Sequence, residues 1–268
     1  MVIDTSVLEA KISFEEVLGK KLRVQFLKHP LAGEKPILVF LHEGLGCIEL
    51  WKGFPQKLAA ALQMNAIVYE RQGYGQSQHL DLPRPTDYLE KEALDWLPAL
   101  LAKLKIEKPI LVGHSDGGSI ALVYAGAYPC TAVISEAAHI FVEELTLEGI
   151  EAVKNHPELD LIKQKLSKYH GEKTTDIFSA WADTWLSPGF RDWNISSYLK
   201  GISCPVLIIQ GKDDEYATEL QVTKILEAMP NATVGRKFMP EKCAHIPHLQ
   251  AEEAVINEML DFIRGLEV

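Results

Sequence analysis

Short, continuous apolar runs recur along this chain and restrict its possible folds more than any other feature. They occupy residues 36–42, 66–69, 109–112, 132–134 and 205–209. Runs of this kind are typical of parallel strands that are buried on both faces. Amphipathic helical patterns lie between them, over residues 51–62, 87–104 and 119–128. Because parallel neighbours must be joined by crossover connections, this alternation predicts an α/β fold with a mostly parallel sheet flanked by helices.

The two ends of the chain extend this pattern. Residues 11–30 alternate apolar and polar around Gly19-Lys20, which predicts an antiparallel hairpin at a sheet edge. A short strand is expected over residues 234–239, and a closing helix over residues 251–265. In a sheet of this type, a functional site lies at the carboxyl ends of the strands.

Residues 140–200 interrupt the rhythm, because they are rich in aromatics and helical in pattern but contain no run typical of a buried strand. We interpret this segment, called the insertion below, as a helical cap over the site. The core is then formed by residues 1–139 and 201–268. Most of the aromatics are expected to pack within the insertion, whereas Trp181 and Trp185 are expected to form an apolar roof that contacts a substrate.

A Gly-x-Ser-x-Gly turn, Gly113 to Gly117, follows the apolar run at 109–112 and precedes a helical pattern. A strand that reverses into a helix within a few residues crowds the backbone, and glycine relieves this because it lacks a Cβ atom. Strand, turn and helix in this order predict that Ser115 is an exposed, strained nucleophile. The alternative is a loop serine between two chance glycines.

A serine nucleophile needs an imidazole base, which in turn needs an orienting carboxylate. The carboxylate candidates are residues 213–215, which follow the run at 205–209, although three adjacent acids also fit a solvated loop. The base candidates are His245 and His248, ahead of the last helix. His114 is an unlikely base because neighbouring side chains diverge in such a turn. Two backbone N–H groups should bind the oxyanion, one from Asp116 and one from residues 41–46.

These motifs together resemble the α/β-hydrolase superfamily, in its capped and cofactor-free branch, over nearly the whole chain. The resemblance implies an eight-stranded, twisted sheet and a catalytic triad of Ser115, Asp214 and His245. It places Asp214 ahead of Asp213, and His245 ahead of His248. It also implies that Gly44 supplies the second oxyanion donor, and we expect the nearby His42 to contact the substrate.

Four positions depart from the superfamily pattern. Glu43 replaces a glycine in the oxyanion loop, so its carboxylate is expected to point away from the oxyanion or to pair with a cation. Glu70 and Gln72 replace the usual Asp and Arg of the next loop. Asp116 stands where many relatives have an apolar or amide side chain, and it is expected to bind a polar substrate group or a water.

Composition and spacing exclude several other classes of function. The net charge of −10 argues against nucleic acid and anionic membranes as partners. The first residues lack the features of a signal peptide, and the four scattered cysteines form no C-x-x-C pair, so we expect a reduced, cytoplasmic protein. Cys243, His245 and His248 lack a fourth metal ligand at a fitting spacing, and residues 73–77 lack the third glycine of a dinucleotide loop. We therefore expect neither a metal nor a cofactor.

The sequence thus predicts a serine hydrolase that cleaves a small to medium carboxylic ester through an acyl-enzyme. The same triad would serve C–C bond hydrolysis of diketones, thioester cleavage or perhydrolysis. A serine at position 115 argues against dehalogenases and epoxide hydrolases of the superfamily, which use an aspartate nucleophile. The alternative from another class is a small-molecule receptor on a retained hydrolase scaffold.

Overall fold

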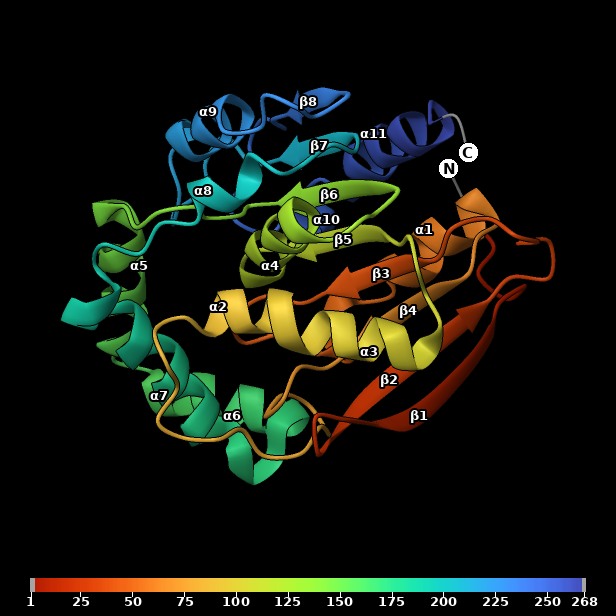
Figure 1. The fold of residues 1–268 in the computed structure, drawn as a ribbon. Helices are drawn as coiled ribbons and strands as arrows, with labels where there is room; N and C mark the ends of the chain where they lie inside the picture. The colour runs from red at the N-terminus through yellow and green to blue at the C-terminus, as the bar shows by residue number, and fades with distance from the viewer. Residues whose placement is uncertain (1–2, 267–268) are drawn as a thin grey trace.

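A computed structural model describes residues 3–266 and contains a single eight-stranded sheet of order β1-β2-β4-β3-β5-β6-β7-β8 (Figure 1). The strands are β1 (Glu9–Val17), β2 (Lys20–Lys28), β3 (Leu38–Leu41), β4 (Ala66–Tyr69), β5 (Ile110–His114), β6 (Ala132–Glu136), β7 (Val206–Ile209) and β8 (Gly235–Phe238). The first two strands pair antiparallel with each other, and β2 pairs antiparallel with β4. All other pairings are parallel, which confirms the mostly parallel sheet predicted from the apolar runs.

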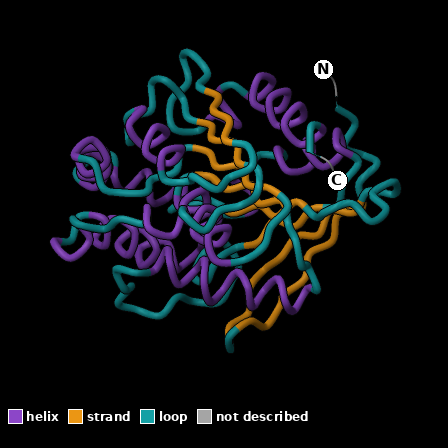
Figure 2. The backbone as a smooth tube through the Cα atoms, turned by 45° about the horizontal axis from the view of Figure 1, so that its top comes forward, coloured by secondary structure: helices purple, strands orange, loops and turns teal. Residues whose placement is uncertain are grey.

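Helices cover both faces of the sheet (Figure 2). They are α1 (Phe54–Leu62), α2 (Tyr88–Lys91), α3 (Leu97–Leu104), α4 (Asp116–Ala127), α5 (Glu144–Lys154), α6 (Leu159–His170), α7 (Thr174–Trp185), α8 (Ser196–Leu199), α9 (Glu219–Glu227), α10 (Pro247–Gln250) and α11 (Glu252–Arg264). Among residues 3–266, no helix combines the length and apolar character that crossing a membrane requires.

The sheet separates two hydrophobic cores, because successive side chains of a strand point to opposite faces. In β3, Leu38 and Phe40 pack with α1 and α11, whereas Val39 and Leu41 pack with α2, α3 and α4. Both faces of the central strands are therefore buried, as continuous apolar runs predict.

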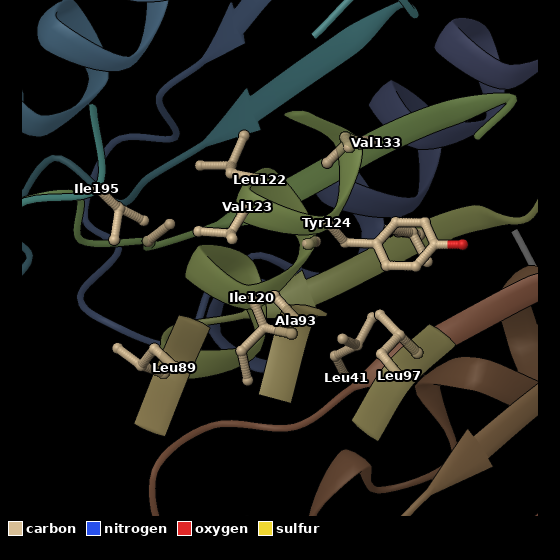
Figure 3. Packing of buried hydrophobic residues seen from close by; sticks show 14 of the residues in the cluster. Leu41, Leu89, Ala93, Leu97, Ile120, Leu122, Val123, Tyr124, Val133 and Ile195 are labelled. Carbon is tan, nitrogen blue, oxygen red and sulfur yellow. The ribbon is translucent and has the colours of Figure 1, made fainter. Parts of the chain in front are cut away.

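Helix α4 lies within the second of these cores. Figure 3 shows Ile120 and Val123 of α4 near Leu89, Ala93 and Leu97 from the neighbouring helical segment. These five side chains are fully buried. Because this packing fixes the first turn of α4, it also fixes the residue just before the helix, Ser115.

The helix expected over residues 87–104 is interrupted. A π-helical turn, Glu92–Trp96, separates α2 from α3. Pro98 explains part of this difference, because it has no N–H to donate to the carbonyl four residues earlier. That carbonyl belongs to Leu94, and it accepts a hydrogen bond of 3.0 Å from the Tyr128 hydroxyl instead.

The insertion folds as helices α5 to α8, and Figure 1 shows α5 to α7 beyond the carboxyl ends of the parallel strands. One isolated bridge, between Phe141 and Asn194, closes the base of this segment. The insertion is therefore placed at the edge of the sheet where Ser115 lies.

Candidate active site

Ser115 lies between the end of β5 and the first residue of α4, Asp116. Its backbone has φ 53° and ψ −116°, a conformation that residues other than glycine rarely adopt. The N–H of Ser115 donates a 2.8 Å hydrogen bond to the carbonyl of Glu136 on β6. A strained backbone held by its surroundings in this way is frequent at functional sites.

The two glycines of the turn are required by close backbone approach. A Cβ atom at Gly113 would collide with the carbonyl of Gly117, and a Cβ atom at Gly117 would collide with the carbonyl of Leu41. Both collisions involve backbone atoms, which cannot rotate away as a side chain can. The turn therefore brings β5, α4 and the end of β3 together only with glycine at both positions.

The structure brings Ser115, His245 and Asp214 into one hydrogen-bonded chain. His245 Nε2 lies 3.0 Å from Ser115 Oγ, and His245 Nδ1 lies 2.9 and 3.0 Å from the two carboxylate oxygens of Asp214. Asp214 also accepts a 2.9 Å hydrogen bond from the N–H of Tyr216. Burial disfavours the charged carboxylate, but these hydrogen bonds outweigh it and lower the pKa of Asp214.

The two alternatives from the sequence lie elsewhere. The ring of His248 is buried against Trp51, and its Nδ1 lies 2.7 Å from Glu136 Oε2. Asp213 is exposed, and its N–H donates to the carbonyl of Cys243. Neither contacts Ser115, so the geometry favours His245 and Asp214, as the resemblance implied.

Gly44 and Asp116 face each other across the cavity beside Ser115. A Cβ atom built on Gly44 would lie 2.7 Å from Cδ1 of Trp181 and 3.5 Å from Oδ2 of Asp116. Asp116 is the first residue of α4, so its N–H has no partner within the helix. The two backbone positions expected to bind an oxyanion are thus adjacent to the nucleophile.

Arg71 connects these two positions, and the sequence reasoning did not identify it. Both terminal nitrogens of its guanidinium lie 3.3 Å from Asp116 Oδ2. One of them, Nη2, also donates a 2.8 Å hydrogen bond to the carbonyl of Glu43. Tyr88 donates a further hydrogen bond of 3.0 Å to the same oxygen of Asp116. The Arg71 side chain is 1% exposed and that of Asp116 is 2% exposed, so the ion pair is fully buried. The Asp116 carboxylate is therefore held in place by Arg71 and Tyr88.

The structure corrects the expected substrate contact of His42. The His42 ring is fully buried and does not line the cavity. Its Nδ1 donates to the carbonyl of Glu43 at 2.7 Å, and its Nε2 accepts the N–H of Arg71 at 3.1 Å. Burial, with the positive charge of Arg71 close by, holds the pKa of His42 well below its usual range. The ring is therefore neutral and shapes the loop.

Glu43 pairs with the histidine that precedes the nucleophile. Its Oε2 lies 3.7 Å from His114 Nδ1, and its carboxylate packs against Gly46. Burial opposes the charge on both groups, but their proximity lowers the pKa of Glu43 to about 2 and raises that of His114. His114 Nε2 donates a 2.7 Å hydrogen bond to the carbonyl of His245. The unusual acid thus lies beside the His114 ring, and that ring supports the loop that carries the base.

A cavity of about 260 Å³ opens above Ser115. Helices α5 and α7 form much of its wall, and both tryptophans expected to contact a substrate lie there. The side chains contributed by the insertion are Thr146, Ile150, Val153, Trp181 and Trp185. Trp185 is almost completely buried, and its Nε1 donates a 3.0 Å hydrogen bond to the Tyr88 hydroxyl.

One group of residues, away from Ser115, brings three possible metal ligands within 4.8 Å of one another: Cys47, Glu49 and Glu70. The guanidinium of Arg23 lies 2.7 Å from Glu49 and 3.0 Å from Glu70. The positive charge that these carboxylates require is therefore supplied by Arg23.

Several known proteins are similar to this chain. The chain is 30% identical to "Serine hydrolase BPHL" of Homo sapiens over 223 residues, which are 78% of this chain and 72% of the relative. It is 26% identical to a "Proline iminopeptidase" of Lactobacillus helveticus, over 85% of this chain and 90% of the relative. A crystal structure of a putative lipase from Acinetobacter baumannii superimposes with a TM-score of 0.74 at 18% identity, over 98% of this chain and 93% of the lipase.

The family model described as "Alpha/beta hydrolase family" matches residues 38–258, which begin at β3 and end within α11. The chain belongs to the alpha/beta hydrolase family.

Proposed function

We propose that this protein is a serine hydrolase that cleaves small to medium carboxylic esters through an acyl-enzyme. The observation that carries the proposal is the hydrogen-bonded chain from Ser115 Oγ through His245 to Asp214. A serine next to a base that is itself oriented by a carboxylate is the arrangement that activates a hydroxyl at neutral pH.

In the first step, His245 Nε2 takes the proton of Ser115 as Oγ attacks the ester carbonyl. Asp214 accepts the hydrogen bond from Nδ1–H and stabilises the imidazolium that forms. The N–H groups of Gly44 and Asp116 donate to the oxyanion of the tetrahedral intermediate. His245 then protonates the departing alcohol, and water, deprotonated by the same imidazole, hydrolyses the acyl-enzyme.

The cavity supports a limited range of substrates. Its volume of about 260 Å³ suits small groups, and Ile150, Val153 and Trp181 give it apolar walls. The acidic residues Glu43 and Glu215 also line it, and none of the described lining residues is Lys or Arg. We therefore expect neutral or positively charged esters to be hydrolysed faster than esters that carry a carboxylate.

The proposal is tested with p-nitrophenyl esters of increasing acyl length. Wild type should turn over the shorter esters, and Ser115→Ala should lose at least about 10³-fold in kcat. The matched control is Ser167→Ala, which removes an exposed hydroxyl bonded to the carbonyl of Gln164 and should leave kcat unchanged. Turnover that survives Ser115→Ala would refute the proposed nucleophile.

A second panel separates the alternatives that share the triad. It contains a thioester, a vinylogous diketone, a prolyl amide, and acetate with hydrogen peroxide. A kcat/KM for any of these well above that for the best ester would replace the ester assignment. Binding of small esters without turnover of any substrate would instead favour a receptor on a hydrolase scaffold.

A further inference from the structure

Two of the four cysteines lie side by side although they are 74 positions apart in the sequence. The Sγ atoms of Cys130 and Cys204 are 3.3 Å apart, and both are free thiols. Cys130 lies just before β6, and Cys204 just before β7. Because β6 and β7 are parallel neighbours, the two thiols meet at the amino ends of the strands.

The backbone fixes this proximity. Val133 on β6 pairs with Val206 on β7, and the N–H of Val133 donates a 3.0 Å hydrogen bond to the carbonyl of Pro205. A disulfide bond is about 2.05 Å long, so the two sulfurs need to approach by only about 1.3 Å. We expect rotations about χ1 of the two cysteines to provide that movement.

The two thiols assist each other's ionisation. Either sulfur can donate the S–H hydrogen bond between them, so the thiolate of one cysteine is stabilised by the S–H of the other. The thiolate is the form that attacks an oxidant. Cys130 is half-buried and Cys204 is 9% exposed, whereas Cys47 and Cys243 are 0% and 1% exposed, so an oxidant reaches this pair at Cys130.

We propose that Cys130 and Cys204 are a redox-sensitive pair that closes to a reversible disulfide on exposure to a peroxide. One sulfur of the pair, as its thiolate, attacks one peroxide oxygen, the O–O bond breaks, and a sulfenic acid forms as hydroxide leaves. The other sulfur then attacks the sulfenic sulfur, and the S–O bond breaks. The displaced oxygen leaves as water with the proton of the second thiol, so two thiols and one hydrogen peroxide give one disulfide and two waters.

The disulfide would stabilise the folded protein against unfolding. It closes a long loop that contains β6 and helices α5 to α8, and crosslinks across long loops restrict the unfolded chain strongly. The pair lies at the amino ends of the strands, whereas Ser115 and Asp214 follow carboxyl ends. Oxidation should therefore raise the Tm by about 4–8 °C and leave ester turnover unchanged.

The experiment treats the reduced full-length protein with a small excess of hydrogen peroxide, and then counts thiols in denaturant. The count should fall from four to two, with a dithiothreitol-reversible peptide that links Cys130 to Cys204 in a tryptic mass map. Cys130→Ser should abolish this peptide and the rise in Tm. The matched control Cys47→Ser should retain both.

Three results would overturn the proposal. These are four thiols after treatment, oxygen added to either cysteine without an S–S link, or a link between two chains on a non-reducing gel. The thiol count and the mass map do not depend on turnover, so the result stands whatever reaction Ser115 performs.

Discussion

Removal of the Arg71 guanidinium tests whether one buried ion pair holds the two oxyanion positions together. Arg71→Met keeps most of the side-chain volume, but it leaves the Asp116 carboxylate buried with only the Tyr88 hydroxyl as a described partner. An uncompensated buried charge of this kind costs about 3–5 kcal/mol. The carbonyl of Glu43 also loses its 2.8 Å donor, which adds about 1 kcal/mol.

We therefore expect Arg71→Met to lower the free energy of unfolding by about 4–6 kcal/mol, measured by urea titration. The matched control is Arg191→Met, whose guanidinium pairs with Glu144 on the surface, where the two side chains are 54% and 64% exposed. A surface pair contributes less than about 1 kcal/mol, so this control should unfold close to wild type. We also expect kcat of Arg71→Met to fall by up to about 10², as when one oxyanion donor is misplaced.

A double-mutant cycle with Asp116→Asn decides whether the ion pair is the cause. In the double variant no unpaired charge remains, so its loss of stability should be at least about 1 kcal/mol smaller than the sum of the two single losses. Losses that add to within about 0.5 kcal/mol would refute the reasoning, because they would show that Arg71 and Asp116 contribute independently. If Arg71→Met folds too weakly to measure, Arg71→Lys, which keeps the charge without the bidentate geometry, completes the same cycle.

Three further variants test the other parts of the site. Asp214→Asn should keep the circular dichroism spectrum but lower kcat by about 10⁴, and a loss below tenfold would exclude its orienting role. The pKa of Glu43 is lowered to about 2 beside His114, so its ionised form stabilises the fold above its ordinary pKa, near 4.3, and this stability is lost as the pH falls from about 4 towards 2. In urea titrations, the free energy of unfolding of Glu43→Gln should therefore fall less over that pH range than that of wild type. If both proteins lose the same free energy over that range, this explanation is contradicted. Gly44→Ala would place a methyl 2.7 Å from the Trp181 indole and should lower kcat about tenfold or more, with partial recovery on adding Trp181→Leu.

The parts of the fold that sequence predicted well are those in which a local pattern has one physical solution. An apolar run such as residues 205–209 has too few residues for a helix and too few polar groups for a surface, so it becomes a buried strand, β7. The single helix expected over 87–104 is instead two helices separated by a π-helical turn. Pro98 and the partner of the Leu94 carbonyl decide where that turn occurs. That partner, Tyr128, lies more than thirty residues away in the sequence.

The site shows the same difference between features set by local sequence and features set by contacts between distant residues. Ser115 could be placed from the strand, turn and helix around it. The same edge of the sheet offered several acids and two histidines, and the resemblance to the superfamily selected Asp214 and His245 from them. Arg71 could not be placed, because its role depends on meeting Asp116 across the space between two loops. Its only sequence signal was that it stands between two departures from the family pattern, Glu70 and Gln72.

The contacts of Asp116 explain how the insertion can influence chemistry as well as substrate fit. The indole N–H of Trp185, at the end of α7, donates to the Tyr88 hydroxyl, and that hydroxyl donates to Asp116. Asp116 accepts hydrogen bonds from Arg71, and Arg71 also donates one to the carbonyl of Glu43, the residue before Gly44. We therefore expect a shift of α7 to move the Asp116 side chain and, through Arg71, the loop that contains Gly44. Because hydrogen bonds to an oxyanion depend steeply on geometry, we expect the position of the roof to influence the rate of the proposed reaction through these buried hydrogen bonds.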